Sequence, residues 1–258
     1  MDKQIISPDG TPIAYQRSGR GPAVVLVSGA MSTGATVAPL ATRLADRFTV
    51  VPYDRRGRGA SGDTAPYAVA REVEDLAALI EAVGGEAALY GVSSGGALAL
   101  RAAASGLPVR QVAVYEPPFA GPGGEKEHTE YTERLTDALA AGRHGDAVEL
   151  FLRLTGLAEQ MIQGARQSPM WADMEAVAPT LAYDDAVMGG GLLPRERISS
   201  IGVPVLAVAG GASPGWLRTA AAEVADTAPK GTFLTLEDQT HRVDPDVLAP
   251  VLAEFFAL

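Results

Sequence analysis

The sequence contains no cysteine, and this absence excludes several kinds of chemistry. Without cysteine, the chain cannot form disulfides, use a thiolate as a nucleophile or bind a metal through sulfur. Basic residues are also scarce, because 21 Lys and Arg stand against 31 Asp and Glu, a formal net charge of −10. Since nucleic-acid binding depends on clustered basic side chains, we expect a small-molecule substrate and no nucleic-acid partner.

Long apolar runs are missing as well. No stretch approaches the roughly 20 apolar residues that a membrane-spanning helix requires, so no membrane span is predicted. Residues 1–8 contain no apolar run of signal-peptide length, and a cytoplasmic location is therefore expected. Hydrophobic residues nevertheless make up 47% of the 258 residues, enough for a sizeable core. The sequence does not indicate an oligomeric state.

The segment from Leu89 to Ala97 changes character within nine residues, from an apolar strand through a tight turn to the start of a helix. It contains the pattern Gly-x-Ser-x-Gly at residues 91–95. At a sharp strand-to-helix turn the serine backbone is strained, and Gly91 and Gly95 would let the two arms pass without Cβ clashes. Ser93 is therefore the candidate nucleophile. The alternative is an ordinary turn before a buried helix.

Apolar runs alternate with amphipathic segments along most of the chain. After a hairpin of residues 3–7 and 11–17, strands are predicted at 23–27, 48–53, 86–90, 109–115, 204–209 and 232–236, with helices between them. The run at 23–27 lacks polar alternation, as in a strand covered on both faces of a parallel sheet. From 121 to 200 only amphipathic helices are predicted, at 127–141, 146–155, 158–166 and around 170–188. We expect a core domain of residues 1–120 and 201–258, with residues 121–200 inserted as a helical lid.

The order of these features resembles the α/β-hydrolase superfamily. The resemblance covers the strand after Pro22, the loop at 54–61, the turn at Ser93 and a histidine before the last helix. It implies an α/β fold with a mostly parallel, doubly wound sheet of about eight strands and an inserted helical lid. It also implies the chain order serine, acid, histidine, with His241 as the general base. We interpret His128 and His144 as solvated helix residues of the insertion.

The acid departs from the commoner family pattern. The usual position is the loop after the strand at 204–209, which here is Gly-Gly-Ala-Ser-Pro and contains no carboxylate. A smaller set of relatives, including some lipases and haloalkane dehalogenases, carries the acid one strand earlier, which here is Glu116. This residue would lie beside the catalytic edge of the sheet and orient His241. Asp238 and Asp244, near the histidine, remain alternatives.

The resemblance further implies two backbone donors for an oxyanion. They would be the N–H groups of Ser94 and of Ala30, with Met31 as an alternative to Ala30. The loop opens with Ser28-Gly29 where relatives commonly have His-Gly. The arginine-rich loop at 54–59 lacks the Lys-Ser/Thr ending of a phosphate-binding loop, and we interpret it as a structural turn.

The sequence thus predicts a serine hydrolase that uses no cofactor or metal. It would cleave a carboxylic ester, lactone or thioester of a small apolar molecule through an acyl-enzyme. Alternatives are acyl transfer, perhydrolysis or carbon–carbon cleavage by the same triad, or a non-catalytic ligand-binding member of the fold. Haloalkane dehalogenation is disfavoured, because it requires an aspartate where this chain has Ser93. No motif in the insertion identifies the substrate.

Overall fold

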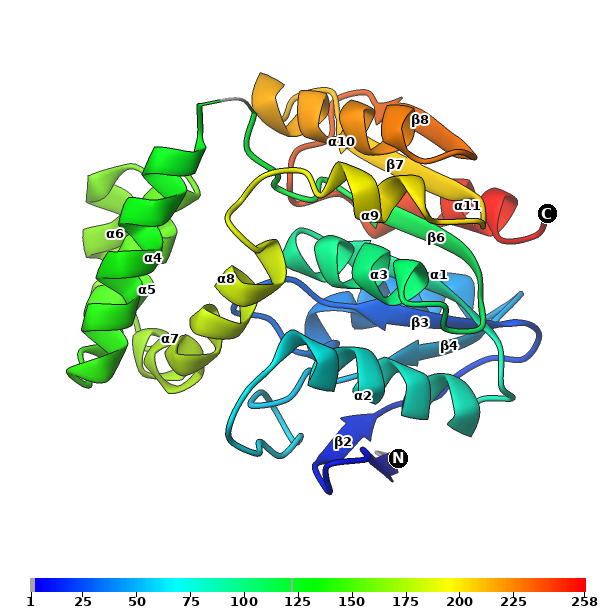
Figure 1. Cartoon of the computed structure of the whole chain (residues 1–258), viewed down its shortest axis with the longest axis horizontal. Helices are drawn as coiled ribbons and strands as arrows, with labels where there is room; N and C mark the ends of the chain where they lie inside the picture. Colours follow the sequence, from blue (N-terminus) through cyan, green and yellow to red (C-terminus); the bar gives the residue numbers. More distant parts are fainter. Residues whose placement is uncertain (1–2, 122) are drawn as a thin grey trace.

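Six parallel strands form the central sheet of the computed structural model, which describes residues 3–121 and 123–258. Their order is β4-β3-β5-β6-β7-β8 (Figure 1). Their bounds are β3 (Ala23–Val27), β4 (Thr49–Pro52), β5 (Ala87–Val92), β6 (Val109–Tyr115), β7 (Val205–Gly210) and β8 (Gly231–Leu236). Parallel strands place all their carboxyl ends at one edge of the sheet, and the loops that follow them meet there.

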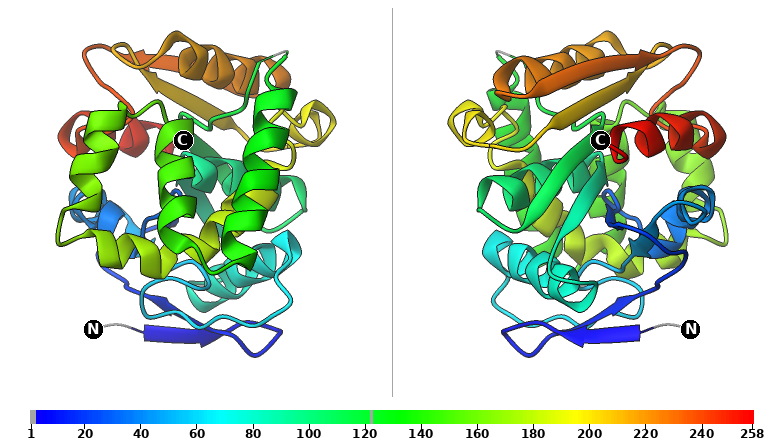
Figure 2. Two further views of the ribbon diagram at one scale, coloured as in Figure 1. Left: turned by 90° about the vertical axis from the view of Figure 1, so that its left-hand side faces the viewer. Right: turned by 90° about the vertical axis from the view of Figure 1, so that its right-hand side faces the viewer.

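The expectation of about eight strands in one sheet was too high. Strands β1 (Lys3–Ile6) and β2 (Pro12–Tyr15) form a separate antiparallel hairpin, visible at the bottom of Figure 2. The chain touches the edge of the main sheet through two isolated bridges, one at the end of β2 between Tyr15 and Tyr53 and one beyond it between Ser18 and Val50. Gly19 and Gly21 then adopt positive φ and Pro22 follows, so the segment cannot continue as a ladder beside β4.

Helices cover both faces of the sheet (Figure 1). One face carries α1 (Ala38–Leu44), which the short 3₁₀ helix η1 (Gly34–Val37) precedes, and α11 (Pro245–Phe255). The other carries α2 (Val69–Ala82), α3 (Ser94–Ala104), α10 (Gly215–Thr227) and the short α9 (Arg195–Ser199). Side chains of β3 alternate between the two layers: Val25 and Val27 pack in one apolar cluster, Val24 and Leu26 in the other. This double coverage explains why the strand is apolar without interruption.

The helices between β6 and β7, except α9, gather beyond the carboxyl edge of the sheet, as Figures 1 and 2 show. They are α4 (Glu125–Ala140), α5 (His144–Leu154), α6 (Glu159–Arg166), α7 (Trp171–Val177), the 3₁₀ turn η2 (Ala178–Thr180) and α8 (Leu181–Met188). Three of the four predicted helices match α4, α5 and α6 within two residues at each end. The fourth was wrong as a single helix, because Pro179 removes a backbone donor and interrupts it.

The segment between β6 and β7 has an apolar cluster of its own, separate from the two beside the sheet. Its buried members include Leu135, Val148 and Trp171, and two residues of the loop after β3, Ala30 and Met31, pack against it. This segment therefore contacts the loop after β3, at the edge where the strands end. Across the part of the chain that the structure describes, none of the helices has the length and apolarity needed to span a membrane.

Candidate active site

Two adjacent strands carry the candidate nucleophile and the candidate acid. Ser93 follows β5 directly and Glu116 follows β6 directly. Backbone hydrogen bonds hold them in register, because Ser93 donates to the Tyr115 carbonyl at 2.9 Å and Glu116 donates to the Val208 carbonyl at 3.0 Å. Both residues therefore lie at the carboxyl edge, one strand apart.

The turn at Ser93 has the strained geometry that its sequence predicts. Ser93 has φ 55° and ψ −130°, a region that costs non-glycine residues about 1–3 kcal/mol. A Cβ on Gly91 would lie 2.3 Å from the Gly95 carbonyl oxygen, and one on Gly95 would lie 2.4 Å from the Val27 carbonyl oxygen. Neither position accepts a side chain without movement of the backbone. The two glycines thus permit the turn to pack between β3 and α3.

Glu116 faces the imidazole of His241. Its Oε2 lies 2.7 Å from His241 Nδ1, and its Oε1 accepts the Gly210 N–H at 2.8 Å. The Glu116 side chain is fully buried, whereas that of His241 is 43% exposed. Burial alone would raise the pKa of Glu116, but the hydrogen bonds from His241 and Gly210 outweigh burial and hold this pKa below its usual value. An ionised carboxylate therefore lies against the ring.

The two alternative acids lie elsewhere. Asp244 caps α11, because its Oδ1 accepts the Asp246 N–H at 2.8 Å. Asp238 is exposed in the turn after β8, with φ 58°. Among the described residues, neither carboxylate makes a hydrogen bond with His241.

The loop that carries His241 is held by groups that sequence reasoning missed. Tyr115, the last residue of β6, donates its hydroxyl to the Thr240 carbonyl at 2.6 Å. The Ala212 N–H donates to the Gln239 carbonyl at 2.9 Å. A signal was available, because the hydroxyl of a buried tyrosine usually has a hydrogen-bond partner and Tyr115 stands at the end of an apolar strand. No hydrogen bond joins Ser93 to His241 in the described chain, and catalytic contacts of this kind often tighten only when substrate binds.

The loop after β3 lies against the candidate nucleophile. A Cβ on Gly29 would lie 3.1 Å from the Ser93 Cβ, so the backbone of this loop approaches the turn closely. The next residue, Ala30, donates its N–H to no backbone carbonyl within the described ranges. Met31 has φ 56°, so the chain reverses direction there. Ser94 is the first residue of α3, where a backbone N–H has no partner within its helix.

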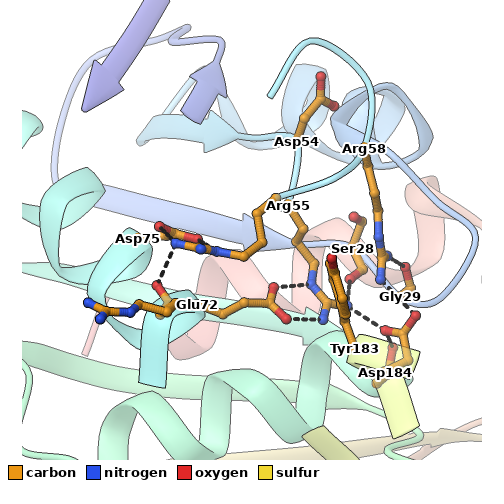
Figure 3. A network of polar contacts seen from close by, with 12 residues as sticks. Ser28, Gly29, Asp54, Arg55, Arg58, Glu72, Asp75, Tyr183 and Asp184 are labelled. Atoms are coloured by element: carbon orange, nitrogen blue, oxygen red, sulfur yellow. Dashed lines mark hydrogen bonds and ion pairs between the residues drawn. The ribbon is translucent and has the colours of Figure 1, made fainter. Parts of the chain in front are cut away.

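The arginine-rich loop at 54–59 is a turn, as its sequence predicted. Its arginine side chains also form a buried ionic network, which the sequence did not predict. Arg55 pairs with Glu72 and Asp184, and Arg58 also pairs with Asp184, each at 2.7 Å (Figure 3). Arg56 pairs separately with Asp75 of α2 and with an aspartate before β2. Breaking one pair of this kind leaves an unpaired buried charge and costs about 3–5 kcal/mol. The network joins helix α8 to helix α2 and to the loop after β4.

The interpretation of His128 as a solvated residue was wrong. Its side chain is 13% exposed, and its Nε2 lies 3.1 Å from Asp185 Oδ1, because α4 packs against α8 at this point. His144 begins α5 and is partly exposed. The structure contains, within its described ranges, no group of three His, Asp or Glu side chains that could hold a metal ion.

Comparison with known proteins identifies the family. A sequence profile of the "Alpha/beta hydrolase family" matches residues 24–251. The solved structure of an alpha/beta hydrolase from Sphaerobacter thermophilus is 54% identical, covers 98% of this chain and 100% of its own, and superimposes with a TM-score of 0.88.

Two curated relatives match more locally. An N-formylmaleamate deformylase from Pseudomonas putida is 32% identical over 57% of this chain, and the match spans 57% of the relative. A pimeloyl-[acyl-carrier protein] methyl ester esterase from Stenotrophomonas maltophilia is 41% identical over 38% of this chain, and the match spans 36% of that relative. The family profile covers most of the chain, the fold agrees with it, and these two relatives are named for hydrolytic activities. The chain belongs to the alpha/beta hydrolase family, which is a family of enzymes.

Proposed function

We propose that this protein is a serine hydrolase that cleaves a carboxylic ester, lactone or thioester of a small apolar molecule. The observation that carries the proposal is the 2.7 Å contact between the buried Glu116 carboxylate and His241 Nδ1, one strand away from Ser93. A carboxylate that accepts from Nδ1–H leaves Nε2 unprotonated, and Nε2 is then the atom that takes a proton. The arrangement supports general-base activation of a serine.

The reaction would proceed in two halves. Ser93 Oγ attacks the acyl carbon while His241 Nε2 takes its proton, and the carbonyl electron pair moves to the oxygen. The N–H groups of Ala30 and Ser94 would hold this oxyanion. When the tetrahedral intermediate collapses, the bond to the leaving alcohol or thiol breaks and His241 returns the proton to it. Water then attacks the acyl-enzyme by the same route, with Glu116 stabilising the imidazolium in both halves.

The insertion would act as the lid that sets specificity. Its apolar cluster packs against Ala30 and Met31, the loop that would hold the oxyanion. A substrate bound at Ser93 would therefore lie between the core, residues 1–120 and 201–258, and the insertion, residues 121–200. The curated relatives are named for a methyl ester esterase and a deformylase. The esterase name agrees with the proposed ester chemistry, whereas the deformylase name describes removal of an N-formyl group, which is held by a C–N bond.

A fluorophosphonate probe tests the nucleophile. The wild-type protein should be labelled on Ser93, and the Ser93→Ala variant should lose both labelling and hydrolysis. Undiminished labelling of Ser93→Ala would refute the assignment. A panel of p-nitrophenyl esters of increasing acyl length, with a set of lactones, would define the substrate class. Adding hydrogen peroxide or alcohol acceptors would show whether the acyl group passes to water or to another acceptor.

A further inference from the structure

A buried ionic cluster connects the insertion with the loop after β3. We define the cluster as Arg55, Arg58, Glu72 and Asp184, whose side chains are all nearly inaccessible to solvent and whose formal charges cancel. Figure 3 shows Arg55 and Arg58 converging on Asp184 from the loop after β4. Asp184 is the member that comes from the insertion, through α8.

The cluster reaches the backbone of the loop that approaches Ser93. Arg58 Nη1 donates to the Gly29 carbonyl oxygen at 2.7 Å, while its Nη2 bonds to Asp184 Oδ2 at the same distance. The Gly29 carbonyl and the Ala30 N–H belong to one peptide unit, which is planar and trans, so the two groups point in opposite directions. By holding the carbonyl, Arg58 fixes the direction of the Ala30 N–H. Its positive charge also polarises this peptide and strengthens the N–H as a donor.

The same carboxylate reaches the second proposed donor. Ser94 Oγ donates to Asp184 Oδ1 at 2.8 Å, so the side chain of the residue that follows the nucleophile is held as well. One oxygen of Asp184 thus contacts Ser94, and the other contacts the guanidinium that holds Gly29.

We propose that Asp184, acting through Arg58 and Ser94, is a positioning residue that aims both oxyanion donors at the substrate. This inference rests on the proposed serine-hydrolase function and adds to it a role for the insertion. Helix α8 would complete the oxyanion site, because no other carboxylate among the described residues bonds to both Arg58 and Ser94.

The test uses two charge-neutral pairs of substitutions. Arg58→Met with Asp184→Asn removes the contacts to Gly29 while leaving Arg55 paired with Glu72. The matched control is Arg56→Met with Asp75→Asn, which breaks a similarly buried ion pair between another arginine of the same loop and α2. Arg56 bonds to Asp75, to another aspartate and to the Arg71 carbonyl, and none of these lies in the loop after β3. Each variant is assayed below its own thermal transition.

The expected result separates positioning from general stability. In the variant with Arg58→Met and Asp184→Asn, kcat should fall about 10- to 100-fold, and KM should change less than about threefold. This loss is smaller than that expected when an oxyanion donor is removed altogether. Affinity for a trifluoromethyl ketone, which forms a tetrahedral oxyanion adduct, should fall by about the same factor as kcat/KM. The control pair should lose thermal stability but keep kcat within about threefold of the wild type.

Arg58→Lys covers the case in which the neutral pair does not fold. Lysine keeps the buried charge but lacks the two-pronged guanidinium that contacts Gly29 and Asp184 together, so an intermediate loss of kcat is expected. Wild-type kcat in Arg58→Lys or in the Arg58/Asp184 pair would overturn the positioning role. If the wild-type protein labels on Ser93, that outcome leaves the proposed function intact. If the wild-type protein neither labels nor hydrolyses esters, both proposals fail.

Discussion

The proposed role of Glu116 as the acid that orients His241 can be tested against the carboxylate of Asp238, which is nearer to His241 in sequence. Glu116→Gln keeps the size of the side chain but removes the charge that would stabilise the imidazolium. We expect kcat to fall about 100- to 10,000-fold with little change in KM, as measured by steady-state ester hydrolysis. Asp238→Asn is the matched control, and it should stay within about twofold of the wild type because Asp238 is exposed and away from the ring. If Asp238→Asn lowers kcat more than Glu116→Gln does, the acid is misassigned.

Tyr115 is expected to matter through the backbone of the residue before His241. Tyr115→Phe removes the hydroxyl that donates to the Thr240 carbonyl. Loss of this bond should cost about 0.5–1.5 kcal/mol of unfolding free energy and lower kcat about three- to tenfold, because the histidine loop gains freedom. Urea denaturation and kcat measure the two effects. Tyr53→Phe is the control, since the Tyr53 hydroxyl is buried without a hydrogen-bond partner in the described structure and its removal should not destabilise.

At the scale of elements, the strand-to-helix turn depends on close approach of β5, α3 and β3. Gly95→Ala would place a Cβ 2.4 Å from the Val27 carbonyl oxygen, so the turn must move. We expect a loss of about 1–3 kcal/mol in unfolding free energy and loss of Ser93 labelling by the fluorophosphonate. Gly164→Ala in α6 is the matched control: its Cβ meets nothing within 4 Å, and alanine should stabilise the helix by about 0.5–1 kcal/mol. Equal changes in unfolding free energy and equal labelling of Ser93 in the two variants would contradict the packing argument.

At the scale of the whole molecule, acid should unfold the protein through its buried carboxylates. Burial alone would raise the pKa of Asp184, but Arg58 and Arg55 outweigh it and hold this pKa below its usual value. The pKa of Glu116 is lowered as well, by its hydrogen bonds. A carboxylate with a lowered pKa stabilises the fold above its unfolded pKa of about 4, and this contribution disappears as pH falls through the folded pKa. The opposite case, Asp75, has a pKa raised by burial and does not add to this stabilisation.

The free energy of unfolding from urea titrations should therefore be level near pH 6–7 and decline below about pH 4. Glu116→Gln should show a shallower decline, because it lacks one of the titrating groups. The comparison is made on unfolding free energies at matched ionic strength, because salt screens exposed ion pairs more than buried ones. Stability that stays level down to pH 2 in the wild type would contradict the prediction.

Local patterns were sufficient for the order of the sheet strands, for most of the helices and for the turn at Ser93. Burial of a strand on both faces, helical periodicity and the clearance that Gly91 and Gly95 provide are properties of a few neighbouring residues, and the chain displays them directly. The break at Pro179 was also local and could have been recognised. The resemblance to a family supplied the expected order of serine, acid and histidine.

Contacts between distant segments were decided by folding. The carboxylate opposite His241 is that of Glu116, and Asp238 and Asp244, nearer in sequence, make no hydrogen bond to the ring in the described structure. Asp184 reaches Arg58 across 126 positions of sequence, and no periodicity encodes such a pairing. A buried arginine requires a carboxylate, but which carboxylate provides it depends on how α8 docks on the core. The turn at Ser93 could be predicted from nine consecutive residues. Arg58 and Asp184, which contact Gly29 and Ser94 beside it, are brought together only by the tertiary structure.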